Sequence, residues 1–267
     1  MSIKLIDQID KLHIFSSIPR RIVSLVPSQS ELLTDLGLEN QIIGITKFCV
    51  HPASLLKNKT KVGGTKNPNF DKIKALNPDI IICNKEENTK EIIEICEEIC
   101  TVWTTDIITI KDNFRMIDDF GQIFNCQESA NKLNSKIKNS LLDFENYIKD
   151  KPIKKTAYFI WKKPYMVVGC NNYINEILKL NRLENIYEYN NFDSNRYPEI
   201  EIENLSVNKD LDLILLSSEP YPFNDKDFDE IQFHSKNAKI ILVDGEMFSW
   251  HGSRILLAIE YFKQLHI

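Results

Sequence analysis

The sequence has no apolar stretch of the length that a membrane span requires. Apolar runs such as 80–83 and 213–216 comprise four residues, whereas a helix needs roughly 20 to cross a bilayer. Glycine and proline are also scarce, at 8 and 10 of 267 residues, which excludes a collagen-like or linker-rich chain. We therefore expect a chain that folds throughout and does not span a membrane.

Basic residues are too few for nucleic-acid binding, and cysteine motifs are too few for a disulfide framework or a zinc site. The 33 Lys and Arg residues are outnumbered by 38 Asp and Glu, giving a net charge of −5, and they form no stripe that would follow a phosphate backbone. This excludes nucleic acid as the main partner. The six cysteines show no repeated CxxC spacing, so we expect mostly buried thiols rather than disulfides or a zinc cage.

The N-terminal residues lack the apolar core of an export signal. Asp7, Asp10 and Lys11 carry charge where a signal peptide must be apolar. We therefore expect a cytoplasmic protein, or a periplasmic one if the start of the chain is misassigned. His13, His234 and His266 are expected in surface segments without a role.

What the sequence does contain is a regular alternation of β-branched runs and amphipathic stretches. Strands separated by helices indicate parallel sheets covered on both faces, so the predicted fold class is α/β with two Rossmann-like lobes. The predicted strands are 21–26, 41–45, 79–83, 100–103, 156–160, 211–216 and 239–243, and the predicted helices are 29–36, 69–76, 89–99, 112–124, 173–180 and 254–265.

A long helix over 128–149 is predicted to connect the lobes. Apolar residues recur at helical spacing along it, and no glycine or proline interrupts it. At about 1.5 Å per residue it extends over roughly 30 Å. We therefore predict an N-terminal lobe of residues 1–125, a rigid backbone helix within 126–151 and a C-terminal lobe of residues 152–267.

Three motifs in order carry a family resemblance. They are Arg-Ile-Val-Ser-Leu-Val-Pro-Ser-Gln-Ser-Glu at 21–31, Val-Gly-Gly-Thr at 62–65 followed by Asn-Phe-Asp-Lys-Ile at 69–73, and Phe-Ser-Trp-His-Gly-Ser-Arg at 248–254. From about residue 20 onward, the chain resembles the ABC-transporter substrate-binding proteins for vitamin B12, haem and iron siderophores, the helical-backbone metal receptors of TroA-like fold. This resemblance implies a class III binding-protein fold with a ligand in the cleft between the lobes, at the strand ends.

The resemblance also implies partners. Family members dock on their permease through one acidic residue per lobe, which places the docking residues at Asp71 and Glu203. Both residues are equally explained as carboxylates favoured at helix N-termini, and docking applies only if the chain is exported. The expected ligand is a small-molecule metal chelate, and homodimer formation is left open.

The cleft loops are expected to be more polar than a site built for a corrin ring. Aromatic residues follow several predicted strands, and charged residues lie among them. The lysines suit an anionic chelate such as a carboxylate siderophore or a haem propionate. The expected ligand-binding residues are Phe48, His51, Lys66, Lys85, Glu86, Trp161, Tyr165, Glu219, Tyr221, Phe248, Trp250 and His251.

A metal ion bound directly by the protein is a further hypothesis. Cys49, His51 and His251 supply thiolate and imidazole, which suit zinc or iron. The alternative is that Cys49 is a small buried hydrophobe and His51 a polar residue at a helix start. His251, before Gly252, either reaches a ligand or caps backbone donors.

Two functions follow. The first is a binding protein for a corrinoid, haem or ferric-siderophore ligand, without catalytic residues. The second is a metal-dependent enzyme using the same cleft, with Glu86 or Glu87 as general base and a metal-bound water as nucleophile. The expected cytoplasmic location and the charge of the cleft loops favour the enzyme, whereas the full set of family motifs and the absence of any catalytic motif favour the binding protein.

Overall fold

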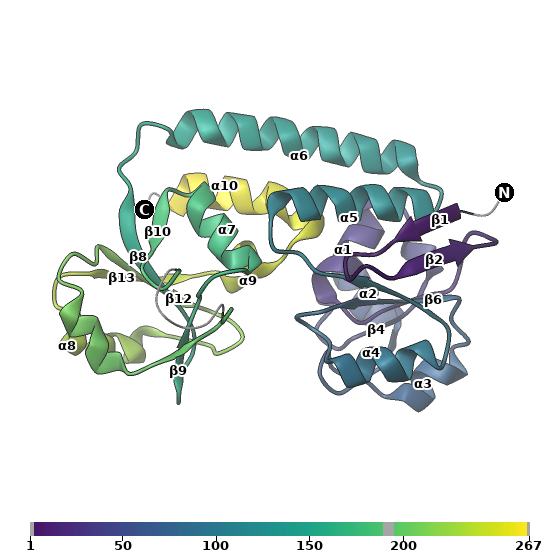
Figure 1. The fold of residues 1–267 in the computed structure, drawn as a ribbon, viewed down its shortest axis with the longest axis horizontal. Helices are drawn as coiled ribbons and strands as arrows, with labels where there is room; N and C mark the ends of the chain where they lie inside the picture. Colours follow the sequence, from purple (N-terminus) through teal and green to yellow (C-terminus); the bar gives the residue numbers. More distant parts are fainter. Residues whose placement is uncertain (1–2, 189–194, 266–267) are drawn as a thin grey trace. The chain divides into compact units, whose positions relative to one another are not determined.

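The computed structural model describes residues 3–188 and 195–265. It divides into two compact units (Figure 1): unit 1 is Met1–Ser140 with His251–Leu256, and unit 2 is Leu141–Trp250 with Leu257–Ile267. The predicted C-terminal lobe comprises all of residues 152–267, whereas the second unit lacks part of this range. Six residues near the C-terminus belong to the first unit instead.

Five parallel strands form the sheet of unit 1, in the order β5-β4-β3-β6-β7. The chain fills the sheet from β3 first in one direction and then in the other, so the order reverses beside β3. In open α/β sheets, ligands bind at such a point, outside the carboxyl ends of the strands. The strands are β3 (Ile22–Ser24), β4 (Ile42–Ile45), β5 (Thr60–Lys61), β6 (Ile80–Asn84) and β7 (Thr101–Thr105).

Helices connect these strands, and apolar side chains fill the space between the sheet and the helices. Every residue of β6 is buried, as expected for a parallel strand covered on both faces. Ile81 of β6 packs in one cluster with Ile73 and Ile92 from the connecting helices. The helices are α1 (Pro27–Asp35), α2 (Ala53–Asn58), α3 (Phe70–Ala75), α4 (Lys90–Glu97) and α5 (Ile110–Ile123), with 3₁₀ turns η1 (Glu39–Gln41) and η4 (Gly252–Arg254).

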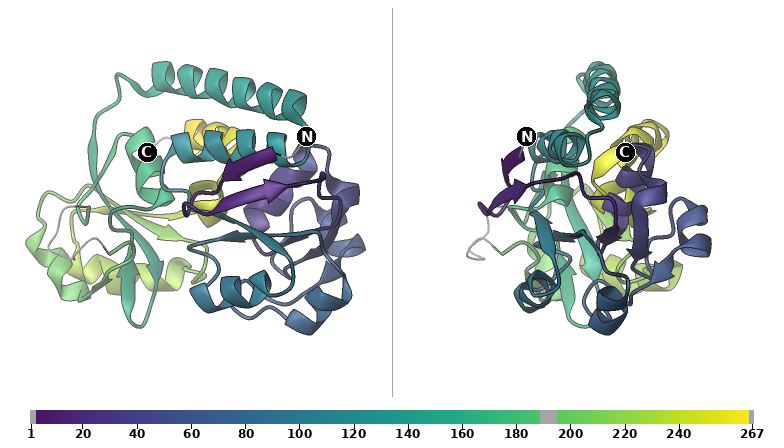
Figure 2. Two further views of the ribbon diagram at one scale, coloured as in Figure 1. Left: turned by 45° about the vertical axis from the view of Figure 1, so that its right-hand side comes forward. Right: turned by 90° about the vertical axis from the view of Figure 1, so that its right-hand side faces the viewer.

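An antiparallel hairpin of β1 (Ile3–Ile6) and β2 (Leu12–Phe15) precedes the first parallel strand, and the sequence analysis did not predict it. Figure 2 shows the hairpin beside α5, where Arg115 donates hydrogen bonds of 2.7 and 3.1 Å to the carbonyls of Ile6 and Asp7. These contacts attach the hairpin to the rest of unit 1.

The expectation that His13 lies at the surface is wrong. His13 is buried, its Nε2 lies 3.0 Å from Oδ2 of the fully buried Asp7, and its ring centroid is 5.1 Å from that of Trp103. The cause is the alternation of the hairpin, which turns every second side chain inward. Asp7 Oδ1 accepts hydrogen bonds from the backbone N–H groups of Ile9 and Lys11 in the hairpin turn.

The sheet of unit 2 has a parallel centre and an antiparallel edge. Its strands follow the order β11-β9-β8-β12-β13, and β10 also pairs with β8. The turn 162–164 between β8 and β9 is too short for a crossover helix, so β9 returns antiparallel to β8, an edge that the sequence pattern did not predict. The strands are β8 (Lys154–Trp161), β9 (Tyr165–Val167), β10 (Leu183–Asn185), β11 (Glu199–Ile200), β12 (Leu213–Ser217) and β13 (Lys239–Val243).

The helices of unit 2 enclose an apolar core. Phe159 and Leu216 from the sheet pack with Leu205 and Ile231 from the covering segments. The segments are α7 (Tyr173–Leu180), η2 (Ile202–Val207), η3 (Asp225–Asp227), α8 (Phe228–His234), α9 (Gly245–Ser249) and α10 (Ile255–Leu265). Helix α7 coincides with its predicted range 173–180. His266, predicted to have no role, lies outside the described residues.

The predicted long helix is present as α6 (Gln127–Ile148), 22 residues without a break. It buries Ala130, Ile137 and Phe144 at intervals of seven residues, so one stripe of the helix packs and the remainder faces water. The boundary between the two units falls inside this helix, after Ser140. A second helix, α10, crosses the boundary after Leu256.

Candidate functional site

The loops after the strands of unit 1 bring Lys66, Lys85 and Glu86 together. Asn84 ends β6, and its Oδ1 accepts hydrogen bonds from the backbone N–H groups of Glu86 and Glu87 at 2.9 and 3.2 Å. Lys66 Nζ donates to the carbonyl oxygen of Glu86. Lys85 forms a 2.9 Å ion pair with Asp106, so part of the positive charge is already neutralised within the protein.

Phe48 is the exposed aromatic residue of this region. Its side chain is 48% exposed, and the ammonium of Lys47 lies 4.9 Å from its ring centroid. Gly64 lies beneath the ring, because a Cβ added there would lie 3.3 Å from Phe48 Cε2. An exposed ring of this kind is available to stack on a flat ligand.

The predicted metal site of Cys49, His51 and His251 is not formed. Across residues 3–188 and 195–265, no group of three or more His, Cys, Asp or Glu side chains is arranged to hold a metal ion. Cys49 is fully buried, and its Sγ lies 3.1 Å from Ser30 Oγ. Burial raises the pKa of the Cys49 thiol, which disfavours the thiolate that a metal requires. The alternative of a small buried residue is the one observed for Cys49.

His251 lies at the start of η4, where it is buried. Its Nδ1 lies 3.4 Å from the hydroxyl of Ser28, at the start of α1. Burial lowers the pKa of His251 to about 4, so the imidazole is neutral across the physiological range. A neutral imidazole is able to accept or donate a hydrogen bond, but it does not attract an anion by charge.

A buried ion pair that was not predicted from the sequence lies beside this histidine. Arg254 of η4 donates from Nε and from a terminal nitrogen to the two carboxylate oxygens of Glu31 on α1, at 2.8 and 2.7 Å. Asn113 of α5 accepts from the N–H of Gly252 and donates to its carbonyl oxygen. Residues 251–256 therefore belong to unit 1 because these contacts attach them to α1 and α5. No sequence signal relates Glu31 to Arg254, which is 223 residues away.

In unit 2, aromatic and acidic side chains follow the carboxyl ends of β8 and β12. Trp161 is 39% exposed, and its ring lies edge-on to that of Tyr221, with centroids 5.8 Å apart. Glu219 Oε1 accepts 3.1 Å hydrogen bonds from both Ser249 Oγ and Trp250 Nε1. The structure thus brings Trp161 against Tyr221 and Glu219 against Trp250, four residues that were each predicted to bind the ligand.

Three predicted ligand residues of unit 2 are in the interior instead: Phe248, Tyr165 and Trp250, the last of which is 9% exposed. Phe248 is fully buried and packs against Tyr158 and Phe262, at centroid distances of 5.1 and 4.9 Å. Tyr165 is 9% exposed, with its ring edge-on to Phe159. The sequence did not distinguish these core residues from loop aromatics, because Phe248 lies in the short helix α9 and Tyr165 begins the unpredicted strand β9.

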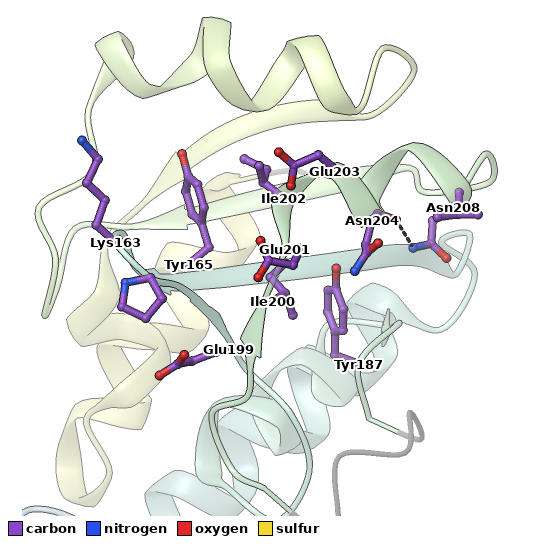
Figure 3. Close-up of a pocket in the computed structure, with 12 residues that line it drawn as sticks. Lys163, Tyr165, Tyr187, Glu199, Ile200, Glu201, Ile202, Glu203, Asn204 and Asn208 are labelled. Atoms are coloured by element: carbon purple, nitrogen blue, oxygen red, sulfur yellow. Dashed lines mark hydrogen bonds between the residues drawn. The ribbon is translucent and has the colours of Figure 1, made fainter.

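A pocket of about 760 Å³ lies in unit 2 beside the β9–β11 edge and η2. Three glutamates line it, together with Lys163, Tyr165 and Tyr187, and Figure 3 shows their side chains around the opening. The glutamates are Glu199, Glu201 and Glu203. Glu203 is exposed in the first turn of η2, and Asp71 is exposed in the first turn of α3 in unit 1.

The model of the periplasmic binding protein family matches residues 22–239, and the chain belongs to that family. Over 177 residues it is 26% identical to the ABC transporter substrate-binding lipoprotein YvrC of Bacillus subtilis, whose function is uncharacterised. That alignment covers 62% of this chain and 55% of YvrC, so the chain matches little more than half of that relative.

Solved structures show the same fold. The periplasmic vitamin B12-binding protein BtuF of Vibrio cholerae superposes with a TM-score of 0.78 at 18% identity, over 92% of this chain and 96% of BtuF. A periplasmic haem-binding protein from Pseudomonas aeruginosa gives 0.78 at 17% identity, over 92% of both chains. The class III fold with two Rossmann-like lobes is confirmed.

The comparisons also concern two further expectations, namely whether the protein is a binding protein or an enzyme and in which cellular compartment it works. Members of this family are binding proteins rather than enzymes. The relatives named above are periplasmic proteins or a lipoprotein, so the expectation of a cytoplasmic protein finds no support among them. No helix among the described residues is long and apolar enough to span a bilayer.

Proposed function

We propose that the chain is the substrate-binding component of an ABC-type uptake system and that it binds a metal chelate of the corrinoid, haem or ferric-siderophore class. The observation that carries this proposal is the family match over residues 22–239. The named ligands of two proteins with the same fold, vitamin B12 and haem, support a large, flat chelate.

Aromatic residues at the strand ends supply the main contact area. Trp161 and Tyr221 in unit 2 and Phe48 in unit 1 present accessible ring surface. Large rigid rings bury much area at a low cost in conformational entropy. Phe248 and Tyr165 are not part of the proposed contact surface, because both are packed in the interior.

Polar residues fix the orientation of the chelate in this proposal. Lys66, Lys85 and Glu86 of unit 1 and Glu219 of unit 2 lie in loops after the strands. His51, which is half-buried, completes the set as a hydrogen-bonding group rather than as a protein ligand of a bare metal, whereas His251 is buried beside Ser28. The metal then arrives inside its chelate, consistent with the lack of a metal-binding cluster in the described part of the chain.

Docking on a permease is part of the same proposal. Asp71 and Glu203 are exposed, each in the first turn of a short helical segment, and Glu203 lines the acidic pocket of unit 2. A carboxylate at such a pocket suits a cationic side chain on the membrane component. This role requires the protein to work outside the cytoplasm, as its named relatives do.

No observation favours the enzyme alternative. Glu86 and Glu87 accompany no metal-binding group in the described residues, and the family supplies binding proteins. Support for a homodimer is likewise absent from the comparisons.

Titration of the purified protein with chelates tests the proposal. Cyanocobalamin, haemin and a ferric siderophore are added separately, and quenching of tryptophan fluorescence and the chelate absorbance bands report binding. We expect at least one to bind, and Trp161→Ala to weaken it about tenfold or more. Phe233→Ala is the matched control, because Phe233 is a 73% exposed aromatic on α8. If the wild type binds none of them, the proposal is wrong.

A further inference from the structure

The side chains at the carboxyl ends of the strands in unit 2 indicate which kind of chelate binds there. We infer that the chelate presents to unit 2 a neutral or cationic edge that donates hydrogen bonds, and that Glu219 is the residue that selects this edge. The inference rests on the proposed function, because it assumes that a chelate binds at the strand ends.

Glu219 is held in a fixed orientation. It lies two residues after the end of β12, and Oε1 accepts from Ser249 Oγ and Trp250 Nε1, both at 3.1 Å. An ionised carboxylate is an acceptor only, with room for about four hydrogen bonds. Two of these are used by the protein, so the group retains capacity to accept from a ligand.

No cation neutralises this carboxylate. Glu219 forms no ion pair with any residue in 3–188 or 195–265. The lysine at the end of β8, Lys162, is already held by Asp227 and Glu230 at 2.7 and 2.8 Å. Burial raises the pKa of Glu219, the hydrogen bonds from Ser249 and Trp250 lower it, and the nearby carboxylates of Glu246 and Asp244 raise it further. This edge of unit 2 is therefore acidic and acceptor-rich.

This charge pattern discriminates among the candidate chelates. A propionate or catecholate oxygen placed at Glu219 would meet a like charge without a compensating cation, which is strongly unfavourable at a desolvated site. An amide N–H or an ammonium group would instead form a charge-assisted hydrogen bond. In unit 1, Lys85 is paired with Asp106, and Lys66 donates to the backbone carbonyl oxygen of Glu86.

The neighbouring aromatic residues fit a flat ring whose edge carries donors. Tyr221 follows Glu219 by two residues in the chain, and Trp161 lies against it at 5.8 Å. Tyr221 therefore lies in the same loop as Glu219, and Trp161, at the end of β8, contacts Tyr221 edge-on. A macrocycle with peripheral carboxamides matches this arrangement better than one with peripheral carboxylates.

Three probes of different charge test the inference on the full chain: cyanocobalamin, with neutral carboxamide edges; haemin, with two propionates; and an anionic ferric tris-catecholate. We expect cyanocobalamin to bind most tightly. Glu219→Gln keeps a carbonyl oxygen for Ser249 and Trp250 while it removes the charge. It should therefore reduce the affinity ratio of cyanocobalamin to haemin about tenfold, with an unchanged tryptophan emission spectrum.

The matched control is Asp229→Asn, which removes one negative charge from exposed α8 in the same unit. It should leave the affinity ratio unchanged. Tighter binding of haemin or the tris-catecholate by the wild type overturns the inference but leaves the proposed function intact. An unaltered ratio in Glu219→Gln also overturns it. Failure of all three probes to bind the wild type contradicts the proposed function as well.

Discussion

Removing Arg254 should destabilise unit 1 strongly, because it leaves the buried Glu31 carboxylate without its partner. Arg254 and Glu31 are 3% and 9% exposed and share two hydrogen bonds of 2.8 and 2.7 Å. Breaking one side of a buried pair of this kind costs about 3–5 kcal/mol. Arg254→Ala should therefore lose about that much stability, a large share of the 5–15 kcal/mol that holds a typical domain folded.

The double variant Glu31→Met/Arg254→Met tests the reasoning behind this magnitude. If the cost arises from an uncompensated buried charge, replacing both partners by apolar side chains should recover most of the loss. If it arises from lost packing around η4, the double variant should be at least as unstable as Arg254→Ala. The two explanations therefore give opposite results.

Urea unfolding followed by tryptophan fluorescence provides the assay. The chain has three tryptophans, and Trp103 is the one in unit 1, fully buried beside His13. In a Trp161→Phe/Trp250→Phe background, Trp103 reports unit 1 separately. With a slope of about 3 kcal/mol per molar urea, Arg254→Ala should lower the midpoint by about 1 M. A shift below about 0.3 M would refute the reasoning.

Three further predictions concern charge and packing. Burial raises the pKa of Asp119 from 3.8 to about 6, so ionisation of this carboxyl destabilises the folded protein as pH rises through that interval. In urea unfolding, Asp119→Asn should be about 1–2 kcal/mol more stable than the wild type at pH 7.5. Below pH 4 the two proteins should be equally stable. Burial lowers the pKa of His251 to about 4, so the stability of the protein should fall as pH drops from 6.5 to 4. His251→Asn should lose less stability over this range. An equal loss in the wild type and the variant would contradict this prediction. Phe144→Ala in α6 should lower stability by about 3–5 kcal/mol, whereas the half-exposed Leu142→Ala should cost less than about 1 kcal/mol.

The pKa of His251 also decides whether this residue causes any pH dependence of ligand binding, or whether other groups do. The sequence suggests weaker binding below about pH 6 if His51 and His251 act as unprotonated ligands. Because the buried His251 remains neutral to about pH 4, any change in affinity between pH 7 and 5 arises from other groups. Affinity measured for His251→Asn across this range checks the point, since its pH profile should match that of the wild type.

Regular alternation made most of the fold predictable. The central strands β3, β4, β6, β7, β8, β12 and β13 lie within or near their predicted ranges, because buried parallel strands are short apolar runs. Helix α6 was predictable because 22 residues keep one apolar stripe without glycine or proline. The N-terminal hairpin was missed because four-residue strands carry too short an alternation to be distinguished from irregular chain.

The site was less predictable because burial and long-range pairing leave little trace in the sequence. Trp161 and Phe248 are both aromatic residues near strand ends, yet one is 39% exposed and the other fully buried. His13 and His251 appeared to differ in role, but both are buried and hydrogen-bonded within unit 1. The contact of Glu31 with Arg254 depends on the whole intervening chain having folded.

The membership of residues 251–256 in unit 1 affects the order in which the protein folds during synthesis. The first unit needs Gly252 and Arg254 for its contacts with Asn113 and Glu31, but the ribosome makes these residues after nearly all of unit 2. Until then, Glu31 has no cationic partner, and the nascent first unit is incomplete. A fragment that ends after α6 should therefore be a poor substitute for unit 1, and the two units should reach their final stability together.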